Sequence, residues 1–511
     1  MSTSPSRILI RDALVFDPSV DGHELQPRDI LIVGDSIAAV TAPGEALADA
    51  SPQPGLEIID ATDRMIVPGF VNAHYHSYDV LAKGMLEDMP FDVWALHSQP
   101  AYFGPRGRAE LRMRVLLGAI ECLRNGITTV QDMNTLLPQD EETLDTILAA
   151  YDEVGIRVVF SIALRDIGAL DIAPFLPGNI PPDILARIAG VDRDPLPDLA
   201  FVEQQILRRK DLPGRISWGL SPSGPQRSSR ILLEGIADIG RRHDLPVFTH
   251  VYETKAQTAK ARAIYTEQGG SMIRWLDEVG LLRPGTTLAH CVWLKQEEMG
   301  LLAERGVSVA HNPISNMKLK SGVAPMRALS CEGVNIALGC DNSSCGDCQN
   351  MFQAMKAFCL MAAVADPQPT GVHAADAIRA ATVGGAKAVG LGGKVGSLQP
   401  GMKADMMIID LTDPAYMPFN SATRQLVFSE SGRGVETTIV DGRIVMRNRR
   451  MVTVDEAAIR AELAELMPKF RSDFAVVVAA NELAKPYLLE ANRNVATFDV
   501  GVERFLEGGT K

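Results

Sequence analysis

Eight short runs rich in β-branched residues recur through the middle of this 511-residue chain, and they constrain its fold more than any other feature. Stretches with helical periodicity separate them, such as AELRMRVLLGAIECLRNG over residues 109–126. Strands that alternate with helices favour parallel β-structure, and eight such units fit a (β/α)8 barrel. The eight expected strands lie at residues 66–74, 126–133, 157–164, 216–224, 245–253, 286–294, 306–315 and 335–343.

The two ends of the chain follow a different pattern. They alternate apolar and polar residues and turn at Gly-Asp or Asp-Gly pairs, which is typical of small antiparallel strands. We expect these strands to pair in one composite β domain made of residues 1–65 and 395–452, beside a barrel of residues 66–394. Residues 453–511 begin with helical periodicity and are predicted to form a C-terminal helical extension used in packing or oligomerisation.

A Pro-rich stretch between Asp171 and Gly214 is longer than an ordinary connection between a strand and a helix. Long connections at the active face of a barrel are often lids. A solvated insertion explains the same composition equally well, so both interpretations stay open.

The composition limits which classes of binding partner and which cellular compartments suit this chain. The chain carries 50 Lys and Arg against 63 Asp and Glu, a net charge of −13, which argues against nucleic acid as a partner. No apolar run reaches transmembrane length, and the first residues, MSTSPSRILIRD, lack the apolar core of a signal peptide. We therefore expect no membrane association and a cytoplasmic location. Seven cysteines, an odd number at low density, fit reduced thiols.

Histidines and carboxylates gather at the ends of the expected strands. His74 and His76 lie two positions apart in a strand, so both imidazoles share a face and can meet one ion. In a barrel, catalytic groups collect at the C-terminal ends of the strands. Any one of these residues can be a simple polar strand end, but their joint placement suits a catalytic divalent ion. The further residues expected at these ends are His250, Glu253, His290, His311 and Asp341.

Longer motifs resemble those of the amidohydrolase superfamily, in its branch of metal-dependent cytosine deaminases, S-adenosylhomocysteine deaminases and triazine hydrolases. The motifs are PGFVNAHYHS, KGMLEDMPFDVWA, FTHVYE, LAHCVWL, HNPISNMKLKSGVAPM, LGCDNSSCGD and KVGSLQPGMKADMMIID, and they cover nearly the whole chain in order. The resemblance implies an α/β fold in which a distorted (β/α)8 TIM barrel stands beside a small β-sandwich domain built from both termini. That agrees with the pattern of strands.

The resemblance also implies roles for the gathered residues. His74, His76, His250 and Asp341 would ligate one divalent metal ion, Glu253 would shuttle a proton, and His290 would orient the attacking water. Asp341 would also accept a proton from that water. Zn²⁺ is the default ion for such ligands, although Fe, Mn or Co accept similar ones. Two-metal members usually bridge their ions with a lysine after the fourth strand. The segment ISWGLSPSG has no lysine, so a mononuclear site is favoured.

The expected substrate contacts depart from the family pattern. Nucleoside-type deaminases of this branch carry a substrate-contacting histidine where this chain has Ser223. Trp94 and His97 follow the first strand and are predicted to hold an apolar or aromatic part of the substrate, although a helix packing face explains them equally well. His311 is predicted to reach the pocket, and a hydrogen bond at the strand end is the alternative.

Two further motifs are interpreted as structural. The segment CDNSSCGDC contains a C-x-x-C spacing at Cys345 and Cys348, but the sequence offers no second pair, so a tight loop is favoured over an independent metal site. The segment GLGGK has glycines like those of a phosphate loop without its spacing, which favours a turn at the end of a helix.

Three functions remain open from the sequence. The favoured one is a metal-dependent enzyme that hydrolyses a non-peptide C–N bond by deaminating a small N-heterocyclic substrate. The second is an amide, urea or carbamate hydrolase acting on a small molecule such as a xenobiotic, with an amine as the product. The third is a non-catalytic scaffold of the dihydropyrimidinase-like kind. The expected partners are a small-molecule substrate and, by resemblance, further copies of the chain in a homo-oligomer.

Overall fold

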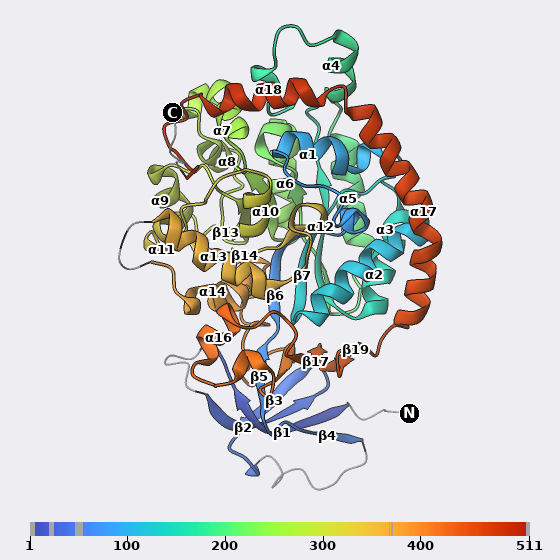
Figure 1. Ribbon diagram of the computed structural model, residues 1–511, viewed down its shortest axis with the longest axis vertical. Coiled ribbons are helices and arrows are strands. Elements are labelled where there is room, and N and C mark those ends of the chain that lie inside the picture. The colour runs from blue at the N-terminus through green and yellow to red at the C-terminus, as the bar shows by residue number, and fades with distance from the viewer. Residues whose placement is uncertain are drawn as a thin grey trace.

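The computed structural model describes residues 6–19, 25–45, 55–168, 170–366, 368 and 371–506. Parts of the predicted composite domain, residues 1–5, 20–24 and 46–54, lie outside the described residues, as do residues 507–511 of the predicted extension. A large body of parallel strands and helices fills the upper part of Figure 1, and a sheet formed by both ends of the chain lies below it.

The strands of the large body are parallel and form two sheets, which an isolated bridge and the connection from β14 to β15 join into a ring. Pairing runs from β6 through β7 to β8, which contacts both β9 and β10. A bridge between Leu220 and Val247 leads to β11, and pairing continues through β12 and β13 to β14. After Gly339 and Cys340 the chain forms β15, which pairs with β6 and completes the (β/α)8 barrel. The bounds are β6 Phe70–His76, β7 Ile127–Asn134, β8 Arg157–Leu164, β9 Ile216–Trp218, β10 Ser221–Pro222, β11 Val247–Val251, β12 Thr286–His290, β13 Ser308–His311, β14 Asn335–Leu338 and β15 Asp341–Asn342.

Several strands are shorter than the sequence predicts. The expected strand at 306–315 ends at His311 because Pro313 occupies the first turn of helix α10 (Pro313–Lys318), where a proline is well tolerated. The expected strand at 216–224 is divided between β9 and β10. These early ends leave loops at the carboxyl edge of the barrel, where side chains can turn toward a site.

Local sequence signals set the helix ends. Helix α3 (Glu141–Val154) begins after Asp140, whose side chain accepts a hydrogen bond from the Thr143 backbone N at 2.8 Å. It ends at Gly155, whose φ of 85° lies in the left-handed region that favours glycine. Strand β6 is buried along its whole length, as expected for a parallel strand covered on both faces.

The helices surround the barrel and extend beyond it (Figure 1). Among the described residues, no helix is both long enough and apolar enough to cross a bilayer. The remaining helices are α1 Phe91–Ser98, α2 Arg108–Arg124, α4 Pro182–Ile188, α5 Leu196–Arg208, α6 Arg230–Arg242, α7 Lys255–Ile264, α8 Met272–Glu278, α9 Gln296–Glu304, α11 Met326–Cys331, α12 Ser343–Gly346, α13 Met351–Ala365, α14 Ala374–Ala381, α15 Val383–Ala388, α16 Ala422–Phe428, α17 Glu456–Asn481 and α18 Lys485–Ala496.

Strands from both ends of the chain share one sheet, which is nine-stranded in the described residues. The N-terminal and C-terminal halves join where β5 pairs antiparallel with β16. A separate hydrophobic core, which includes Ile10, Ile30 and Met406, supports this sheet. The strands are β1 Arg7–Val15, β2 Gln26–Val33, β3 Ser36–Thr41, β4 Leu56–Asp60, β5 Arg64–Pro68, β16 Met406–Asp410, β17 Val435–Val440, β18 Arg443–Arg447 and β19 Arg450–Met451.

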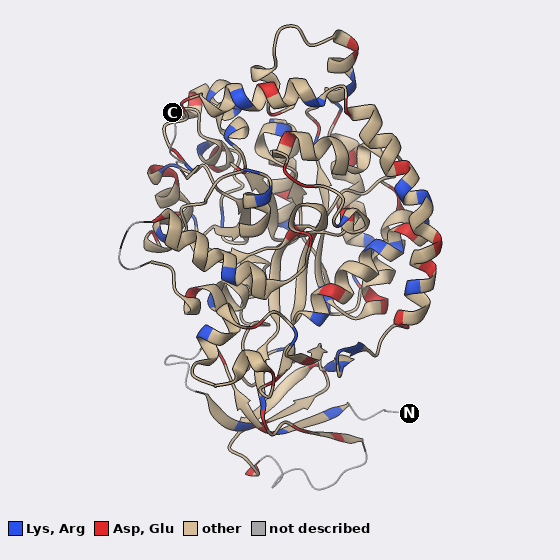
Figure 2. Cartoon of the chain, in the orientation of Figure 1, with Lys and Arg blue, Asp and Glu red and all other residues tan. Residues whose placement is uncertain are grey.

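The last two helices wrap around the barrel. Helix α17 contacts α1 and α2, and α18 contacts α1 and α7 (Figure 1). Figure 2 shows Lys, Arg, Asp and Glu interspersed along α17, as expected for a helix with one face in solvent. The predicted boundaries of the domains at residues 65, 394 and 452 remain predictions.

The insertion between Asp171 and Gly214 contains a short 3-10 helix, η4 (Ala173–Phe175), followed by α4 and α5. Ile172 and Ile188 from this insertion pack with Leu488 and Val495 of α18. The insertion is therefore anchored to the C-terminal helix as well as to the barrel.

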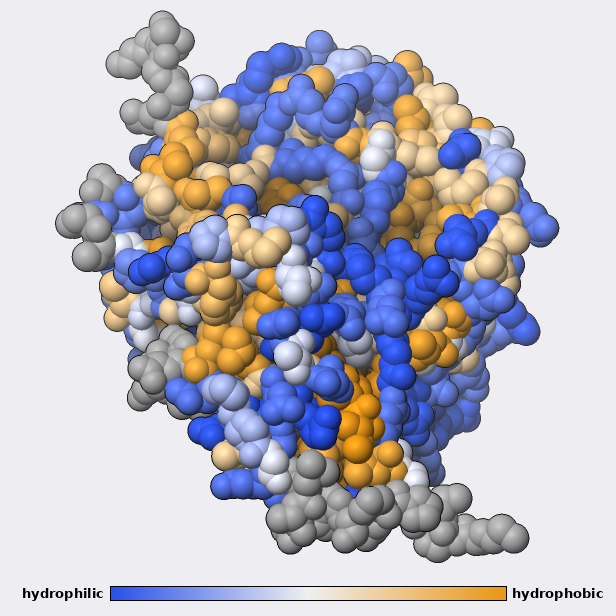
Figure 3. Space-filling view, turned by 60° about the horizontal axis from the view of Figure 1, so that its bottom comes forward, coloured by the Kyte–Doolittle hydropathy of each residue, from blue (hydrophilic) through white to orange (hydrophobic). Residues whose placement is uncertain are grey.

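Apolar side chains are exposed on several elements. Met417, Phe419 and Phe428 are exposed by 60%, 41% and 39% in the segment between β16 and β17. Figure 3 shows apolar patches broken by polar side chains on the face where the bottom of Figure 1 comes forward. Such surface is compatible with the predicted homo-oligomer, which stays a prediction.

A buried ion pair joins the barrel to the terminal sheet. Arg157, at the start of β8, contacts both carboxylate oxygens of Asp405 at 2.7 and 2.9 Å and also contacts Asp441 at 2.8 Å. The side chains of Arg157 and Asp405 are 4% and 1% exposed. Removing one partner of a buried pair leaves an uncompensated charge and typically costs about 3–5 kcal/mol. We expect Arg157→Met to lower the free energy of unfolding by this amount in urea titrations.

Arg112→Met is the matched control for this prediction. Arg112 also contacts two carboxylates, those of Glu153 and Glu462, but its side chain is 32% exposed. An exposed pair contributes about 0–1 kcal/mol. Equal destabilisation by the two substitutions would contradict the structural role assigned to Arg157.

Candidate active site

The histidines and carboxylates expected at the strand ends do converge at the carboxyl edge of the barrel. His74 and His76 lie on β6, His250 on β11, His290 ends β12 and Asp341 begins β15. The Nε2 atoms of His74 and His76 lie 3.5 and 3.4 Å from Asp341 Oδ1. All of these residues except His250 are almost fully buried, and His250 is partly buried. The barrel thus brings groups that are 267 positions apart in sequence, residues 74 and 341, into one cluster.

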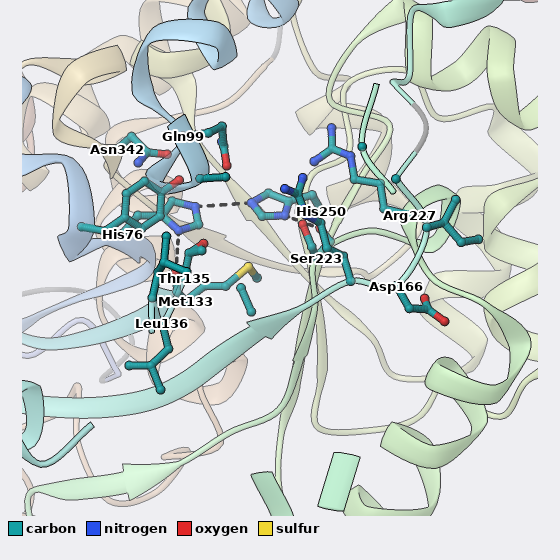
Figure 4. Close-up of a pocket in the computed structure, with 18 of the residues that line it drawn as sticks. His76, Gln99, Met133, Thr135, Leu136, Asp166, Ser223, Arg227, His250 and Asn342 are labelled. Atoms are coloured by element: carbon teal, nitrogen blue, oxygen red, sulfur yellow. Dashed lines mark hydrogen bonds between the residues drawn. The ribbon is translucent and has the colours of Figure 1, made fainter. Parts of the chain in front are cut away.

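The ring orientations of His76 and His250 identify what the cluster can bind. His76 Nδ1 lies 2.6 Å from the Met133 carbonyl oxygen, and His250 Nδ1 lies 2.5 Å from the Ser223 carbonyl oxygen. A carbonyl oxygen only accepts, so each Nδ1 carries the proton and each Nε2 presents a lone pair. These two Nε2 atoms face each other 3.4 Å apart (Figure 4). Two opposed lone pairs favour a cation between or beside them.

His74 and Asp341 complete this environment. His74 Nε2 is buried and has no hydrogen-bond partner among the described residues. An unsatisfied buried nitrogen is costly unless a ligand completes it. Asp341 adds the carboxylate that a divalent ion needs, and its Oδ2 accepts a hydrogen bond from Ser315 Oγ at 2.5 Å. The donor set therefore fits a divalent ion of the zinc type.

The electrostatic environment keeps the side chains of the cluster in the protonation states that bind a cation. Burial, followed by repulsion from the neighbouring histidines, lowers the pKa of both His74 and His250, so their imidazoles stay neutral at pH 7. Burial alone would raise the pKa of Asp341. His290, His76 and the hydrogen bond from Ser315 outweigh burial, so the pKa of Asp341 is lowered and its carboxylate stays charged.

Glu253 and His290 stand beside this set. His290 Nε2 lies 3.9 Å from Glu253 Oε2 and 4.0 Å from Asp341 Oδ2. Asn316 Oδ1 lies 2.8 Å from His290 Nδ1 and holds the ring from behind. Burial raises the pKa of Glu253 to about 7, although the nearby His290 opposes it. A carboxyl group with such a pKa suits proton transfer near neutral pH. Ligand atoms of Glu253, His290 and Asp341 also lie within 4.8 Å of one another, so Glu253 is a competing candidate ligand.

A cavity of about 490 Å³ opens onto this cluster. His76, His250, Glu253, His290 and Asp341 line one part of it. Figure 4 shows His76 and His250 facing each other, with Gln99 and Asn342 on the side of His76 and Arg227 and Asp166 on the side of His250. Three arginines add positive charge to the wall, namely Arg165, Arg193 and Arg227. The volume fits a small ring system with substituents.

The predicted substrate residues divide into two groups. Trp94 and Ser223 line the cavity, and Trp94 Nε1 donates a hydrogen bond to Ser344 Oγ at 2.9 Å. His97 and His311 are not among the described residues that line it. His97 is buried near Glu482 and Lys485 of the C-terminal helices. His311 lies 3.5 Å from Asn316 Nδ2, and burial lowers its pKa to about 3. Contact between these residues and a substrate stays a prediction.

Sequence reasoning missed the residues that hold the cluster in place. Ser315 and Asn316 support Asp341 and His290, and both belong to the motif HNPISN from which only His311 was selected. Their position after β13 at the carboxyl edge is a signal that could have identified them. The insertion also reaches the cavity, since Gly190, Val191 and Arg193 line it.

The cysteines play no part in the cluster. All seven are free, and none belongs to a candidate metal group of the described residues. Cys345 is buried in α12, and Cys348 follows that helix. The loop interpretation of the C-x-x-C spacing agrees with this arrangement.

We expect Ser315→Ala to weaken metal binding about 10- to 100-fold, because partners that orient a metal ligand typically contribute that much. The substitution removes the hydrogen bond to Asp341 Oδ2 and leaves the carboxylate free to rotate. Competition with a fluorescent chelator would measure the affinity. Ser308→Ala is the control, since Ser308 is also buried but begins β13, at the edge of the barrel away from the cluster, whereas Ser315 lies in α10 at the carboxyl edge. Equal effects of both substitutions would contradict the orienting role.

Comparison with known proteins adds independent findings. The model of the Amidohydrolase family matches residues 65–445 of this chain. The 5'-deoxyadenosine deaminase of Methanothermobacter thermautotrophicus is 33% identical over 457 residues, which cover 88% of this chain and 97% of that protein. The 5-methylthioadenosine/S-adenosylhomocysteine deaminase of Syntrophobacter fumaroxidans is 31% identical over 472 residues, covering 90% and 98%.

A solved structure resembles the whole fold. The crystal structure of an adenosine deaminase from Xanthomonas campestris with bound zinc has a TM-score of 0.78 and 26% sequence identity, and the match covers 92% of this chain and 99% of that one. The similarity extends over barrel and terminal sheet alike.

Proposed function

This chain belongs to the amidohydrolase family, and we propose that it is a mononuclear metal-dependent aminohydrolase that releases ammonia from a small amino-substituted nitrogen heterocycle. The proposal rests above all on the facing Nε2 atoms of His76 and His250, each fixed by a backbone carbonyl behind it. Hydrogen bonding alone does not explain that arrangement in the described residues, whereas a shared cation does.

We assign the ion to His74, His76, His250 and Asp341. When bound, a divalent ion acidifies water enough to make a nucleophile near neutral pH. Zn²⁺ is our choice because three imidazoles and one carboxylate suit it, and because the similar adenosine deaminase contains zinc. The absence of a lysine from β9 and β10 favours one ion rather than two.

The remaining side chains would handle protons and orientation. Asp341 would accept a proton from the attacking water. Glu253 would pass a proton to a ring nitrogen of the substrate and then to the departing amino group, since both events need one group that can hold and release a proton. His290, held by Asn316, would orient the water from its Nε2 side.

The relatives support the substrate class. The two relatives from Methanothermobacter thermautotrophicus and Syntrophobacter fumaroxidans are named as deaminases of adenosine derivatives. An aminated ring near the size of a purine is therefore the first class of substrate to test. Ser223 lines the cavity and contributes only a hydroxyl group there, so recognition of the ring must use other residues. The predicted cytoplasmic location and homo-oligomer stay part of this proposal.

The product identifies the reaction. Incubation of the metal-loaded protein with a panel of aminopurines, aminopyrimidines, aminotriazines, arylureas and carbamates should release ammonia from one or more of the heterocycles. Ammonia by glutamate dehydrogenase coupling and amines by chromatography would be measured in parallel. Release of an amine alone, from an acyclic substrate, would contradict the deaminase proposal and establish the amide or urea hydrolase instead.

A further inference from the structure

Arg227 lies in the wall of the cavity, and the proposed chemistry gives it no role. It ends the short 3-10 helix η5 (Pro225–Arg227), and its side chain is 16% exposed. Its backbone is fixed, because its carbonyl oxygen accepts hydrogen bonds from Asp166 and Ile167. Arg227 lines the same cavity as Ser223 and Glu253, and Figure 4 shows it on the side of His250.

Only part of the Arg227 guanidinium is occupied by protein groups. Its Nη2 donates to Asp171 Oδ2, and its Cζ lies 5.5 Å from the centre of the Phe91 ring. Asp171 is shared, since Lys260 Nζ lies 3.4 Å from its other oxygen. Within the described residues, neither Nε nor Nη1 of Arg227 has a hydrogen-bond partner. A largely buried cation therefore brings free donors to the border of the cavity.

Free donors on a buried arginine favour a ligand with an oxygen acceptor. Arginine presents its donors in a planar fork that matches carbonyl and carboxylate oxygens. Phe91 lies beside the guanidinium, with its ring centre 5.5 Å from Cζ, and also lines the cavity. Asp171 stays charged, because Arg227 and Lys260 lower its pKa despite burial, so the anchor of the fork is permanent near pH 7.

We propose that Arg227 determines substrate specificity by donating hydrogen bonds to an oxygen acceptor, an oxo or a carboxylate group, carried by the heterocyclic substrate. This inference rests on the proposed deaminase function and names a substituent that its substrate bears. The amino group would lie at the metal cluster, and the oxygen would lie toward Arg227. A ring without such an oxygen leaves the arginine donors desolvated and unpaired, which is the strongest basis for rejection by a binding site.

Matched ligands test the inference without depending on turnover. The probes are 4-aminopyrimidine, its 2-oxo form cytosine, and 4-aminopyrimidine-2-carboxylic acid. Binding to the metal-loaded full chain would be measured by the shift of the melting temperature with ligand concentration, which reports affinity whether or not the ligand reacts. We expect at least one of the two oxygen-bearing probes to bind about tenfold or more tightly than 4-aminopyrimidine, since a hydrogen bond to a charged group commonly contributes that much. Which of the two binds better distinguishes an oxo from a carboxylate substrate.

Three variants test whether the preference for oxygen-bearing probes depends on Arg227. Arg227→Met should bind the oxygen-bearing probes and 4-aminopyrimidine about equally tightly. Arg227→Lys should keep part of the preference for the oxygen-bearing probes. The double variant Arg227→Met with Asp171→Asn removes both charges of the pair and guards against misfolding caused by a buried Asp171 that has lost Arg227. Arg215→Met is the control, because Arg215 is also a buried arginine paired with an aspartate, Asp152, but it precedes β9 and does not line the cavity. Its preference should equal that of the wild type.

A preference that survives in both Arg227→Met proteins would overturn the inference, and so would wild-type protein that shows no preference or binds none of the probes. Failure of the proposed function is a separate outcome. Protein that binds an oxygen-bearing probe through Arg227 but releases ammonia from no heterocycle would contradict the deaminase proposal and leave the role of Arg227 in binding intact. Ammonia release from a heterocycle, with no effect of the Arg227 substitutions on binding or turnover, would support the deaminase proposal and contradict the role of Arg227.

Discussion

The His74→Ala variant will be purified without its metal ion and will show no turnover above background. His74 Nε2 is the buried nitrogen that lacks a hydrogen-bond partner in the described residues, and it lies 3.5 Å from Asp341 Oδ1. Alanine removes a ligand from the centre of the cluster, so the loss should exceed the ~10- to 100-fold effect expected for an outer partner such as Ser315. Metal per chain by elemental analysis, together with the rate on the best substrate of the panel, would measure it.

His243→Ala is the control for this experiment. His243 caps the C-terminal end of α6 and pairs with Glu203, before β11 begins and therefore at the other edge of the barrel. The control should keep about one ion per chain and full activity. A His74→Ala protein that retained its metal would show that the ion is bound elsewhere, for example by the alternative set of Glu253, His290 and Asp341.

The Glu253→Gln variant should keep its metal and lose about 10²- to 10⁴-fold in turnover, the usual contribution of a positioned acid or base. Glutamine has the same shape but cannot take up or release a proton. Because burial places the pKa of Glu253 at about 7, the wild-type carboxyl exchanges its proton readily at neutral pH. Turnover number and metal content of the same preparation would be compared.

Two results would contradict the role of Glu253. Full activity of Glu253→Gln would exclude it as the proton shuttle. Loss of the metal together with activity would instead place Glu253 among the ligands, as its position near His290 and Asp341 permits. Retained metal with lost activity agrees only with the proposed assignment.

Much of the site follows from the sequence because the barrel obeys a simple rule. Periodicity predicts parallel strands, parallel strands share one carboxyl edge, and that edge gathers His74, His76, His250, His290 and Asp341. The strand spacing of the first two histidines predicts that they act together, and their Nε2 atoms do both approach Asp341 Oδ1. The pairing of the two chain ends follows from their antiparallel pattern and from the resemblance.

Contacts made through loops and helix packing cannot be predicted from the order and direction of the strands. Asp171 and Arg227 are 56 positions apart and meet because the insertion folds back onto the loop after β10. His97 shares α1 with Trp94, yet it lies near the C-terminal helices rather than at the cavity, and no local signal predicts where those helices pack. The hydrogen bond from Ser315 to Asp341 likewise depends on where β13 ends and α10 begins.

Titration of the metal-free enzyme with Zn²⁺ tests the central claim most directly. A single ion held by His74, His76, His250 and Asp341 should restore ammonia release in proportion to added metal until one equivalent per chain, after which the rate should stay constant. A rate that rises until two equivalents would contradict the mononuclear site. Full activity in chelated, metal-free protein would contradict the metal-dependent mechanism itself.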